Sequence, residues 1–564
     1  MTAEVLRHLG GPGTGKTHTL LEYIRDEKDD GLALEDLIFC SFTRSQRDAV
    51  RSRIRDIFPE ATVQAIRKQV KTVHGAALTD CLHAGLIPPI APGTSPIITE
   101  KTTPKPFALF CYRQGLAYQP GYGDFEPGEE YRKYGGIPAG NLIFSLARYI
   151  RQQYAWTPEH WMTAMRAKGM TEMPGIADVP GTIRAWEAFK AEHHLFEHDD
   201  YVDLAIRREA LPRARVIVID EFQDLTPAQY RLFRSWCDSP VERIYIAGDP
   251  NQTIYGFRGA DPAFLTRTPA TDRGELPVSH RCPAAIMRVA DTVLGAPSYM
   301  QPKGTGGLVA TFCPASAEQL IRSVRRLYER YGRVLILSRF RRYVGILARM
   351  LSDGGLPVTG LTPGRVYGWE DVWTTDGRIR VAMPVLLRII RALDDYDTNA
   401  VSWMVPPADV AVLVQASTLP EERKRALMTN LKVAGNLFIG DLPELLGIGP
   451  DSGSRPAVQM AASLDLSLKL RHNLIRALAN RISPGAIRID TIHAAKGLEA
   501  PAVVLHTGYL PSRLKGYFGQ SPDQRSRETE ERRVYYVGAT RASEALFLLD
   551  GLCGTLAPPL EQVV

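Results

Sequence analysis

Gly10-Gly11-Pro12-Gly13-Thr14-Gly15-Lys16-Thr17 follows directly on the apolar run from Val5 to Leu9. The order of apolar strand, glycine-rich turn and helix start is that of a P-loop. The backbone N–H groups of such a turn hold phosphate oxygens, while Lys16 adds a positive charge and the Thr17 hydroxyl can bind Mg²⁺. The alternative is a loop that is glycine-rich for other reasons, but the complete G-x-x-x-x-G-K-T spacing argues against it. The sequence therefore predicts binding of a nucleoside triphosphate.

Length and composition describe an ordinary folded protein with more than one domain. The 564 residues are too many for one core, and 45% apolar and 23% charged residues are typical of globular proteins. We expect a cytoplasmic protein without membrane contact, because no apolar run approaches a membrane span and no signal pattern opens the chain. The seven cysteines form no C-x-x-C pair, so we expect them to be buried apolar side chains. The net charge of +6 mildly favours a polyanionic partner.

A second strong signal follows the apolar run from Arg215 to Ile219, which is typical of a buried parallel strand. The run ends in the acidic stretch Asp220-Glu221-Phe222-Gln223-Asp224. In a chain with a P-loop, we expect Asp220 to hold Mg²⁺ and Glu221 to orient and deprotonate the attacking water. A purely structural acidic cluster is the alternative.

A third expected strand, from Arg243 to Ala247, leads into a polar and aromatic stretch that ends at Ala260. From this strand end we expect Gln252 to reach a γ-phosphate. We expect Tyr255, Phe257 and Arg258 to face a second ligand, different from the nucleotide. Because the neighbours of Phe257 are polar, we expect its ring to be accessible and to stack on a base. The alternative for Phe257 is a core residue.

Two other stretches combine aromatic and basic residues, as nucleic-acid surfaces do. The expected strand Leu37–Cys40 ends in Ser41-Phe42-Thr43-Arg44-Ser45-Gln46, at an edge where ligand-binding loops lie. There Phe42 either stacks on a base or caps the next helix. The expected helix from Asn141 to Trp156 contains Arg148-Tyr149-Ile150-Arg151, which forms either a nucleic-acid surface or a solvated helix face.

The chain shows an α/β pattern twice, and a segment of different character interrupts each copy. We assign residues 1–75 and 184–280 to a first core, and residues 76–183 to a subdomain inserted into it. A second core comprises residues 281–393 and 482–564, with a short and mostly helical insertion at 394–481. The expected fold class is α/β, with parallel sheets flanked by helices.

Eight stretches, taken in order, resemble the motif series of the UvrD/Rep family of superfamily 1 DNA helicases. They are GGPGTGKT, SFTRSQ, TVH, VIDEFQD, GDPNQTIYGFRGA, SHR, TIHAAKGLE and YYVGATRA. The ordered set spans nearly the whole chain and is far more specific than any one motif. The resemblance implies two RecA-like P-loop NTPase cores that clamp ATP between them, with single-stranded DNA across their top.

The resemblance also implies a role for each matching residue. Lys16 and the other P-loop residues serve the phosphates, Thr17 and Asp220 serve Mg²⁺, and Glu221 serves the water. Gln252 senses the γ-phosphate, Glu499 suits a ribose hydroxyl, and Arg281 and Arg541 resemble arginine fingers inserted from the second core. The positions that match the family's DNA contacts are Phe42, Thr43, Arg44, Thr72, His74, Tyr255, Phe257, Arg258, Thr491 and His493.

Three departures from the family pattern concern the base and the insertion. Nine residues precede the P-loop, so we do not expect the upstream glutamine segment with which relatives read adenine. His18 and His280 stand where relatives commonly have an arginine and a tyrosine, and both imidazoles are expected near the base. The second insertion is shorter than is usual in the family. We therefore expect weak selectivity for the base.

The preferred interpretation is an ATP-dependent helicase and translocase that uses ATP and Mg²⁺ and moves 3′ to 5′ on single-stranded DNA, with tailed duplex DNA as a further substrate. One alternative is a translocase that strips proteins from DNA without unwinding it. Another is a nucleotide-switched clamp on nucleic acid. RNA stays open as a substrate because base stacking does not distinguish sugars. The sequence indicates no protein partner, pathway or oligomeric state.

Overall fold

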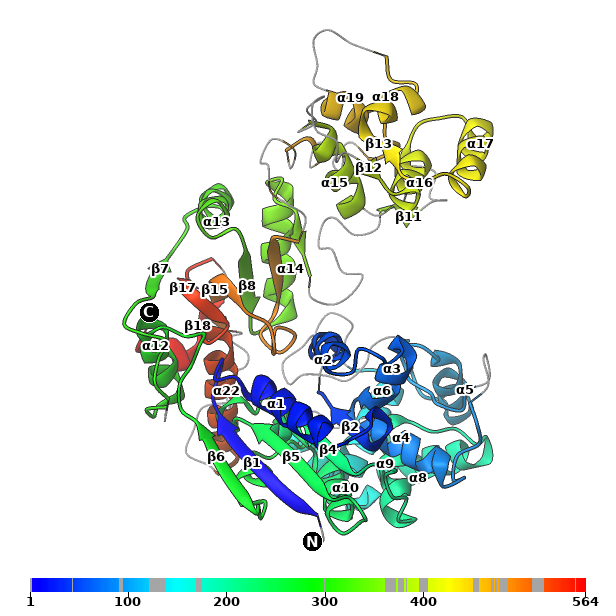
Figure 1. Cartoon of the computed structure of the whole chain (residues 1–564), viewed down its shortest axis with the longest axis vertical. Helices are drawn as coiled ribbons and strands as arrows, with labels where there is room; N and C mark the ends of the chain where they lie inside the picture. Colours follow the sequence, from blue (N-terminus) through cyan, green and yellow to red (C-terminus); the bar gives the residue numbers. More distant parts are fainter. Residues whose placement is uncertain are drawn as a thin grey trace. The chain divides into compact units, whose positions relative to one another are not determined.

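The computed structural model (Figure 1) divides into two compact units. It describes residues 3–42, 44–90, 95–120, 137–168, 175–298, 300–360, 372–373, 380–381, 383–394, 404–449, 456–467, 471, 474–476, 478, 482, 485–509, 522–552 and 554–563. Unit 1 comprises Met1–Gly306 and Ser512–Thr540, and unit 2 comprises Gly307–Pro511 and Arg541–Val564.

Unit 1 is built on a six-stranded parallel sheet with the order β3-β2-β4-β5-β1-β6. Its strands are β1 (Glu4–Gly10), β2 (Leu37–Cys40), β3 (Val70–Lys71), β4 (Val216–Ile219), β5 (Arg243–Gly248) and β6 (Asp272–Leu276). The helices of this core are α1 (Lys16–Asp29), α2 (Arg44–Ile57), α3 (Val63–Gln69), α4 (Val73–His83), α9 (His198–Arg207), α10 (Pro227–Cys237) and α11 (Ala263–Arg267).

Helices cover both faces of this sheet, which explains why the central strand β4 is apolar at every position. In β4, Val216 and Val218 pack in one cluster with α1, α2 and α3. Their neighbours Ile217 and Ile219 pack in another cluster with α4, α9 and α10. Successive side chains of a strand point to opposite faces, so a strand covered on both faces has no polar position.

The inserted segment of unit 1 is a separate helical cluster. Its helices are α5 (Pro104–Gln114), α6 (Ala139–Gln152), α7 (Trp161–Ala167) and α8 (Val179–Glu192). At its centre the fully buried Trp186 contacts the rings of Phe107, Phe110 and Phe144, with ring centroids 4.7 to 5.1 Å apart. Large aromatic side chains give this small cluster a core of its own.

Two further helices belong to unit 1: α12 (Ala284–Leu294) and α22 (Pro522–Ala539). They lie against each other, and α22 also contacts the short turn Pro250–Gln252. From the sequence, both helices were expected in the second core. The structure instead places the change of unit at Gly306, after α12, and returns α22 to unit 1.

Unit 2 contains a second six-stranded parallel sheet, with the order β7-β17-β15-β8-β14-β9. The strands are β7 (Leu308–Phe312), β8 (Val334–Ser338), β9 (Val358–Thr359), β14 (Ile487–Thr491), β15 (Ala500–His506) and β17 (Ala542–Leu549). One face packs in a shared apolar cluster with α13 (Ala317–Tyr331) and α14 (Arg341–Asp353).

The helical insertion of unit 2 has its own apolar cluster. It consists mainly of α15 (Met383–Asp394), α16 (Pro407–Ala416), α17 (Glu421–Leu431), α18 (Leu442–Leu445) and α19 (Pro456–Ala462), with the strand pair β12 (Met404–Val405) and β13 (Leu437–Phe438). Two further antiparallel strand pairs are β10 (Val372–Trp373) with β11 (Arg380–Val381) and β16 (Gly508–Tyr509) with β18 (Thr555–Leu556).

Two parallel sheets flanked by helices confirm the expected fold class. Within the described ranges, every helix is too short or too polar to cross a bilayer. Five of the cysteines are buried as expected, but the expectation was wrong for Cys313, which is exposed, and Cys553 lies outside the described residues.

Candidate active site

The P-loop lies between the end of β1 at Gly10 and the start of α1 at Lys16. Gly13 and Gly15 have φ angles of 72° and 88°, which residues with a Cβ rarely adopt. Lys16 is only 8% exposed, and its Nζ donates hydrogen bonds to the carbonyl oxygens of Gly10 and Gly11 at 2.7 and 2.8 Å. Burial lowers the pKa of Lys16, although the carboxylates around it act in the opposite direction. A phosphate oxygen could replace these carbonyls as the partner of Nζ.

The two residues expected to hold Mg²⁺ lie together at the start of α1. The Thr17 hydroxyl donates to Oδ2 of Asp220 at 2.7 Å, and Oδ1 of Asp220 accepts from the Glu221 amide at 2.9 Å. Burial, followed by the charge of Glu221, raises the pKa of Asp220 to about 6. A buried carboxylate beside a hydroxyl provides the hard oxygen atoms that Mg²⁺ prefers, so these residues fit the ion.

Glu221 follows the strand β4 in a strained backbone conformation, with a φ angle of 57°. One oxygen of its carboxylate, Oε1, accepts from Nε2 of Gln46 at 2.9 Å, and the other, Oε2, accepts from Nε2 of Gln223 at 2.6 Å. Left-handed backbone at a residue with a Cβ persists only where the surroundings enforce it, and it is common at functional sites. Glu221 is thus held by its backbone and by two amides.

A chain of hydrogen bonds joins Glu221 to the expected phosphate sensor, Gln252. The side-chain oxygen of Gln223 accepts from the Asp249 amide at 3.0 Å, and Oδ2 of Asp249 accepts from Nε2 of Gln252 at 2.8 Å. Burial raises the pKa of Asp249, and Lys16 opposes this shift. No role was expected for Gln46, Gln223 or Asp249 from the sequence. All three stand inside recognised motifs, but a motif does not specify which partner a side chain contacts.

The segment from Ser279 to Met300 packs on the P-loop. The Ser279 hydroxyl donates to the Pro12 carbonyl at 2.7 Å, and the backbone amide of the next residue donates to the Gly13 carbonyl at 2.8 Å. A Cβ at Gly11 would lie 1.8 Å from the sulfur of Met300, so only glycine fits at this contact.

Arg281 belongs to this segment and lies beside Gly13, where an added Cβ would be 2.3 Å from the Cβ of Arg281. Its guanidinium Nη1 donates to the Thr540 carbonyl at 3.4 Å. The structure therefore places Arg281 in unit 1 with the P-loop, whereas its motif had predicted that the second core supplies it.

The two histidines at the expected base positions are both accessible. The His18 side chain is 68% exposed and lies 3.8 Å from Glu22, whereas the backbone amide of the exposed His280 is the one that bonds to Gly13. Imidazoles in these positions can stack on a base. Stacking alone does not read the edge of a base.

In unit 2, Arg541 and Glu499 are brought close together. Arg541 is almost fully buried, and its Nη1 donates to the Leu498 carbonyl at 3.3 Å. Glu499, the next residue, is exposed. Two further expected DNA contacts, Thr491 and His493, are buried in this unit.

Three of the expected DNA-contacting residues form an aromatic cluster in unit 1. The half-buried Phe42 lies against Tyr255, with ring centroids 5.1 Å apart, and the guanidinium of Arg258 lies 5.3 Å from the Tyr255 centroid. Phe257, also near Arg258, is only 2% exposed. The expectation that its ring is accessible was wrong, because the turn Gly256–Arg258 directs it inward. Thr43 and the side chain of Arg44 lie outside the described residues.

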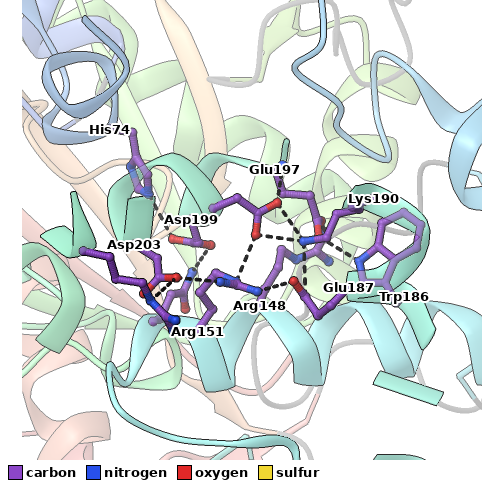
Figure 2. Close-up of polar contacts among 12 residues, drawn as sticks. His74, Arg148, Arg151, Trp186, Glu187, Lys190, Glu197, Asp199 and Asp203 are labelled. Carbon is purple, nitrogen blue, oxygen red and sulfur yellow. Dashed lines mark hydrogen bonds and ion pairs between the residues drawn. The ribbon is translucent and has the colours of Figure 1, made fainter. Parts of the chain in front are cut away.

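Thr72 and His74 are both engaged by the protein at the start of α4. The Thr72 hydroxyl caps the helix by accepting from the Gly75 amide at 3.1 Å. The His74 ring is held on both sides, with Nε2 3.1 Å from Asp199 (Figure 2) and Nδ1 3.2 Å from the amide nitrogen of Gln229.

The interleaved stretch around Arg148 is neither a nucleic-acid surface nor a solvated helix face, so both expectations were wrong. Tyr149 is buried, and Arg148 donates to Glu100 at 2.6 Å. Figure 2 shows the arginines of α6 lying among carboxylates from α8 and α9. The partners of Arg151 are Glu187, Asp200 and Asp203.

The sheets, the P-loop and the acidic strand end define a P-loop NTPase with two RecA-like cores. Two family models match the chain: the UvrD/REP helicase N-terminal domain at residues 185–271 and the UvrD-like helicase C-terminal domain at residues 465–550. These matches, in the order that the motifs predict, confirm the resemblance of the chain to the UvrD/Rep-type helicases of superfamily 1.

Relatives with curated names show the same resemblance. The chain is 26% identical over 585 residues to the ATP-dependent DNA helicase UvrD2 of Mycobacterium tuberculosis, a match that covers 96% of this chain and 75% of the relative. It is 25% identical to the DNA helicase II of Rickettsia typhi, covering 59% of this chain and 60% of the relative. A shorter match, 54% identical over 95 residues, covers 15% of this chain and 8% of the RecBCD enzyme subunit RecB of Escherichia coli.

Proposed function

We propose that this chain is an ATP-dependent DNA helicase and translocase that moves 3′ to 5′ along single-stranded DNA. The observation that carries the proposal is the Thr17–Asp220 pair beside the restrained carboxylate of Glu221, at the start of a P-loop helix. Phosphoryl transfer to water needs this combination of a phosphate cradle, oxygen ligands for Mg²⁺ and a positioned base. The UvrD2 relatives are named ATP-dependent DNA helicases, which supports the same activity here.

Each residue of the site has a distinct task in this proposal. Lys16 exchanges its carbonyl partners for phosphate oxygens, and Thr17 and Asp220 hold Mg²⁺, which, when bound, neutralises phosphate charge. Glu221 orients the attacking water and takes its proton. Gln252 reports the state of the γ-phosphate to Glu221 through the hydrogen-bonded chain described above. Arg281 and Arg541 supply positive charge for the transition state, and Glu499 contacts the ribose.

The aromatic cluster supports single-stranded nucleic acid as the second substrate. The half-buried Phe42 offers a ring face on which a base can stack, the buried Tyr255 packs against it, and Arg258 adds a charge for the phosphate backbone. The 3′ to 5′ direction rests on the resemblance of TIHAAKGLE to the family's motif.

The hydrolytic roles are tested with two variants and a matched control. Lys16→Ala should abolish DNA-stimulated ATP turnover. Glu221→Gln should keep ATP binding and lose turnover by about 10²- to 10⁴-fold, because a positioned base contributes about this much. Glu192→Gln, at an exposed position of α8, is the control and should match the parent. Parent-like turnover in Glu221→Gln would assign the base to another residue.

Translocation is tested by timing ATP turnover and arrival at the end of single-stranded DNAs of increasing length. A helicase or translocase takes longer on longer strands, whereas a nucleotide-switched clamp shows no such dependence. Partial duplexes with a 3′ or a 5′ tail then test direction and unwinding. Preferential unwinding from the 5′ tail would contradict the proposed polarity, and movement without unwinding would indicate a translocase that strips proteins from DNA.

A further inference from the structure

Gln46 connects the expected nucleic-acid loop to the catalytic carboxylate. It lies in the first turn of α2, which begins at Arg44, and its side chain reaches the loop after β4. There its Nε2 donates to Oε1 of Glu221 at 2.9 Å. The contact joins residues 175 positions apart in the chain.

The second amide on Glu221 has a different origin. Gln223 lies two residues after Glu221, and its own side chain is fixed by the Asp249 amide at 3.0 Å. Gln223 therefore moves with the catalytic loop. Gln46 is the donor on another helix, so a shift of α2 relative to this loop changes the Gln46 contact and leaves the Gln223 contact in place.

A hydrogen bond from a neutral amide favours the charged form of a carboxylate over its protonated form. The base that deprotonates water must accept a proton, so each such donor opposes the proton transfer. Glu221 has an amide donor on each oxygen in this structure. We therefore expect the Gln46 contact to occupy a carboxylate oxygen that would otherwise accept from the attacking water.

The start of α2 is close to the aromatic cluster in the chain. Phe42, four residues before Gln46, is the half-buried ring that contacts Tyr255 at 5.1 Å. A base that stacks on Phe42 would have to displace or join this ring pair, which moves the chain entering α2. A displacement of about 1 Å is enough to break an amide–carboxylate hydrogen bond, because such bonds are lost beyond about 3.5 Å.

We propose that Gln46 is a positioning residue that restrains Glu221 until nucleic acid engages Phe42, and thereby makes ATP hydrolysis depend on nucleic acid. The proposal rests on the proposed function, since it assumes that Glu221 is the base and that single-stranded DNA is the activator. In this proposal Gln46 acts through its hydrogen bond to Glu221 and does not itself contact a substrate.

The test compares Gln46→Met with Gln64→Met. Methionine has nearly the length of glutamine but no amide donor, and Gln64 is an exposed residue of α3. ATP turnover is measured without DNA and with saturating oligothymidylate. In Gln46→Met, DNA-free turnover should rise by about tenfold, as expected for loss of a hydrogen bond to a charged group, while turnover with DNA changes by less than about twofold. Gln64→Met should match the parent in both.

Kinetic constants distinguish restraint from a general structural effect. Without DNA, the gain in Gln46→Met should lie in kcat while KM for ATP stays unchanged, because the contact acts on Glu221 and not on the bound nucleotide. A thermal melt checks that the variant is folded, and Gln46→Ala replaces it if methionine prevents folding.

Equal losses of turnover with and without DNA would contradict the restraint and make Gln46 a structural support. An unchanged ratio of stimulated to DNA-free turnover would refute it as well. These results differ from failure of the proposed function, in which the parent protein itself shows no stimulation by single-stranded DNA.

Discussion

Asp80 makes the stability of unit 1 depend on pH. It lies in α4, the helix that begins after Thr72, and is only 1% exposed. Burial raises its pKa from the ordinary 3.8 to about 7, and the nearby Lys71 opposes this rise. Replacing the carboxyl group by an amide of the same shape, in Asp80→Asn, removes this titration.

The sign of the effect follows from where the proton is held. Between pH 3.8 and about 7, the unfolded chain has released the proton from Asp80 and the folded protein retains it. The contribution of Asp80 to the free energy of unfolding is therefore fully present below pH 3.8 and is lost as the pH rises from there through about 7. Each pH unit in this window costs about 1.4 kcal/mol, which sums to about 4 kcal/mol of free energy of unfolding.

We expect Asp80→Asn to be more stable than the parent at pH 8 by up to about 4 kcal/mol, and by only about 1 kcal/mol at pH 4.5. Calorimetric melting at both pH values measures this, with a rise in melting temperature at pH 8 of roughly 5 to 10 °C. Asp29→Asn, at an exposed position of α1, is the control. A difference in melting temperature that is the same at both pH values would refute the reasoning, because it would show that Asp80 does not titrate in this range.

Three further outcomes are expected. Phe257→Ala should cost about 3 to 5 kcal/mol in unfolding free energy even without DNA, as buried Phe→Ala changes do, whereas Tyr112→Ala, at an 86% exposed position, should leave the melting temperature unchanged. Unchanged melting of Phe257→Ala would contradict its burial. Arg151→Met should cost about 1.5 to 3 kcal/mol, because the half-buried carboxylates of Glu187, Asp200 and Asp203 lose a shared cation and keep only Lys190 or Arg207; unchanged melting would contradict this. With His18 and His280 able only to stack, kcat/KM for GTP should lie within about tenfold of that for ATP, a difference of about 1.4 kcal/mol; a strong preference for ATP would mean that other residues read adenine.

The features that could be predicted from the sequence are those in which neighbouring residues determine the structure. The P-loop from Gly10 to Thr17 depends on backbone conformations that its own glycines provide. The acidic pair after β4 follows a strand that is apolar at every position because both faces are covered. In both cases the spacing of residues along the chain determines how their side chains lie in space, so the fold class and the core of the active site could be inferred together.

The features that the sequence did not predict depend on partners far away in the chain. Arg148 and Arg151 resemble an exposed basic stripe because their acidic partners come from other elements, such as Glu100 and α9. Phe257 has polar neighbours, but the turn that contains it is packed against α22, where Glu530 lies close to Gly256. Local polarity is a poor guide to burial where a distant helix covers the segment.

His74 shows how such distant contacts limit a role inferred from a motif. The side-chain oxygen of Gln229 accepts from the Thr226 amide at 3.1 Å, so its nitrogen faces His74 and donates to Nδ1. The ring proton must then be on Nε2, where it is donated to Asp199. Asp199 also accepts from Gln152 of the inserted helix α6 at 3.0 Å. A DNA phosphate that accepted a hydrogen bond from His74 would have to displace Asp199. Binding of DNA at His74 would therefore disturb the contact between the core of unit 1 and its insertion.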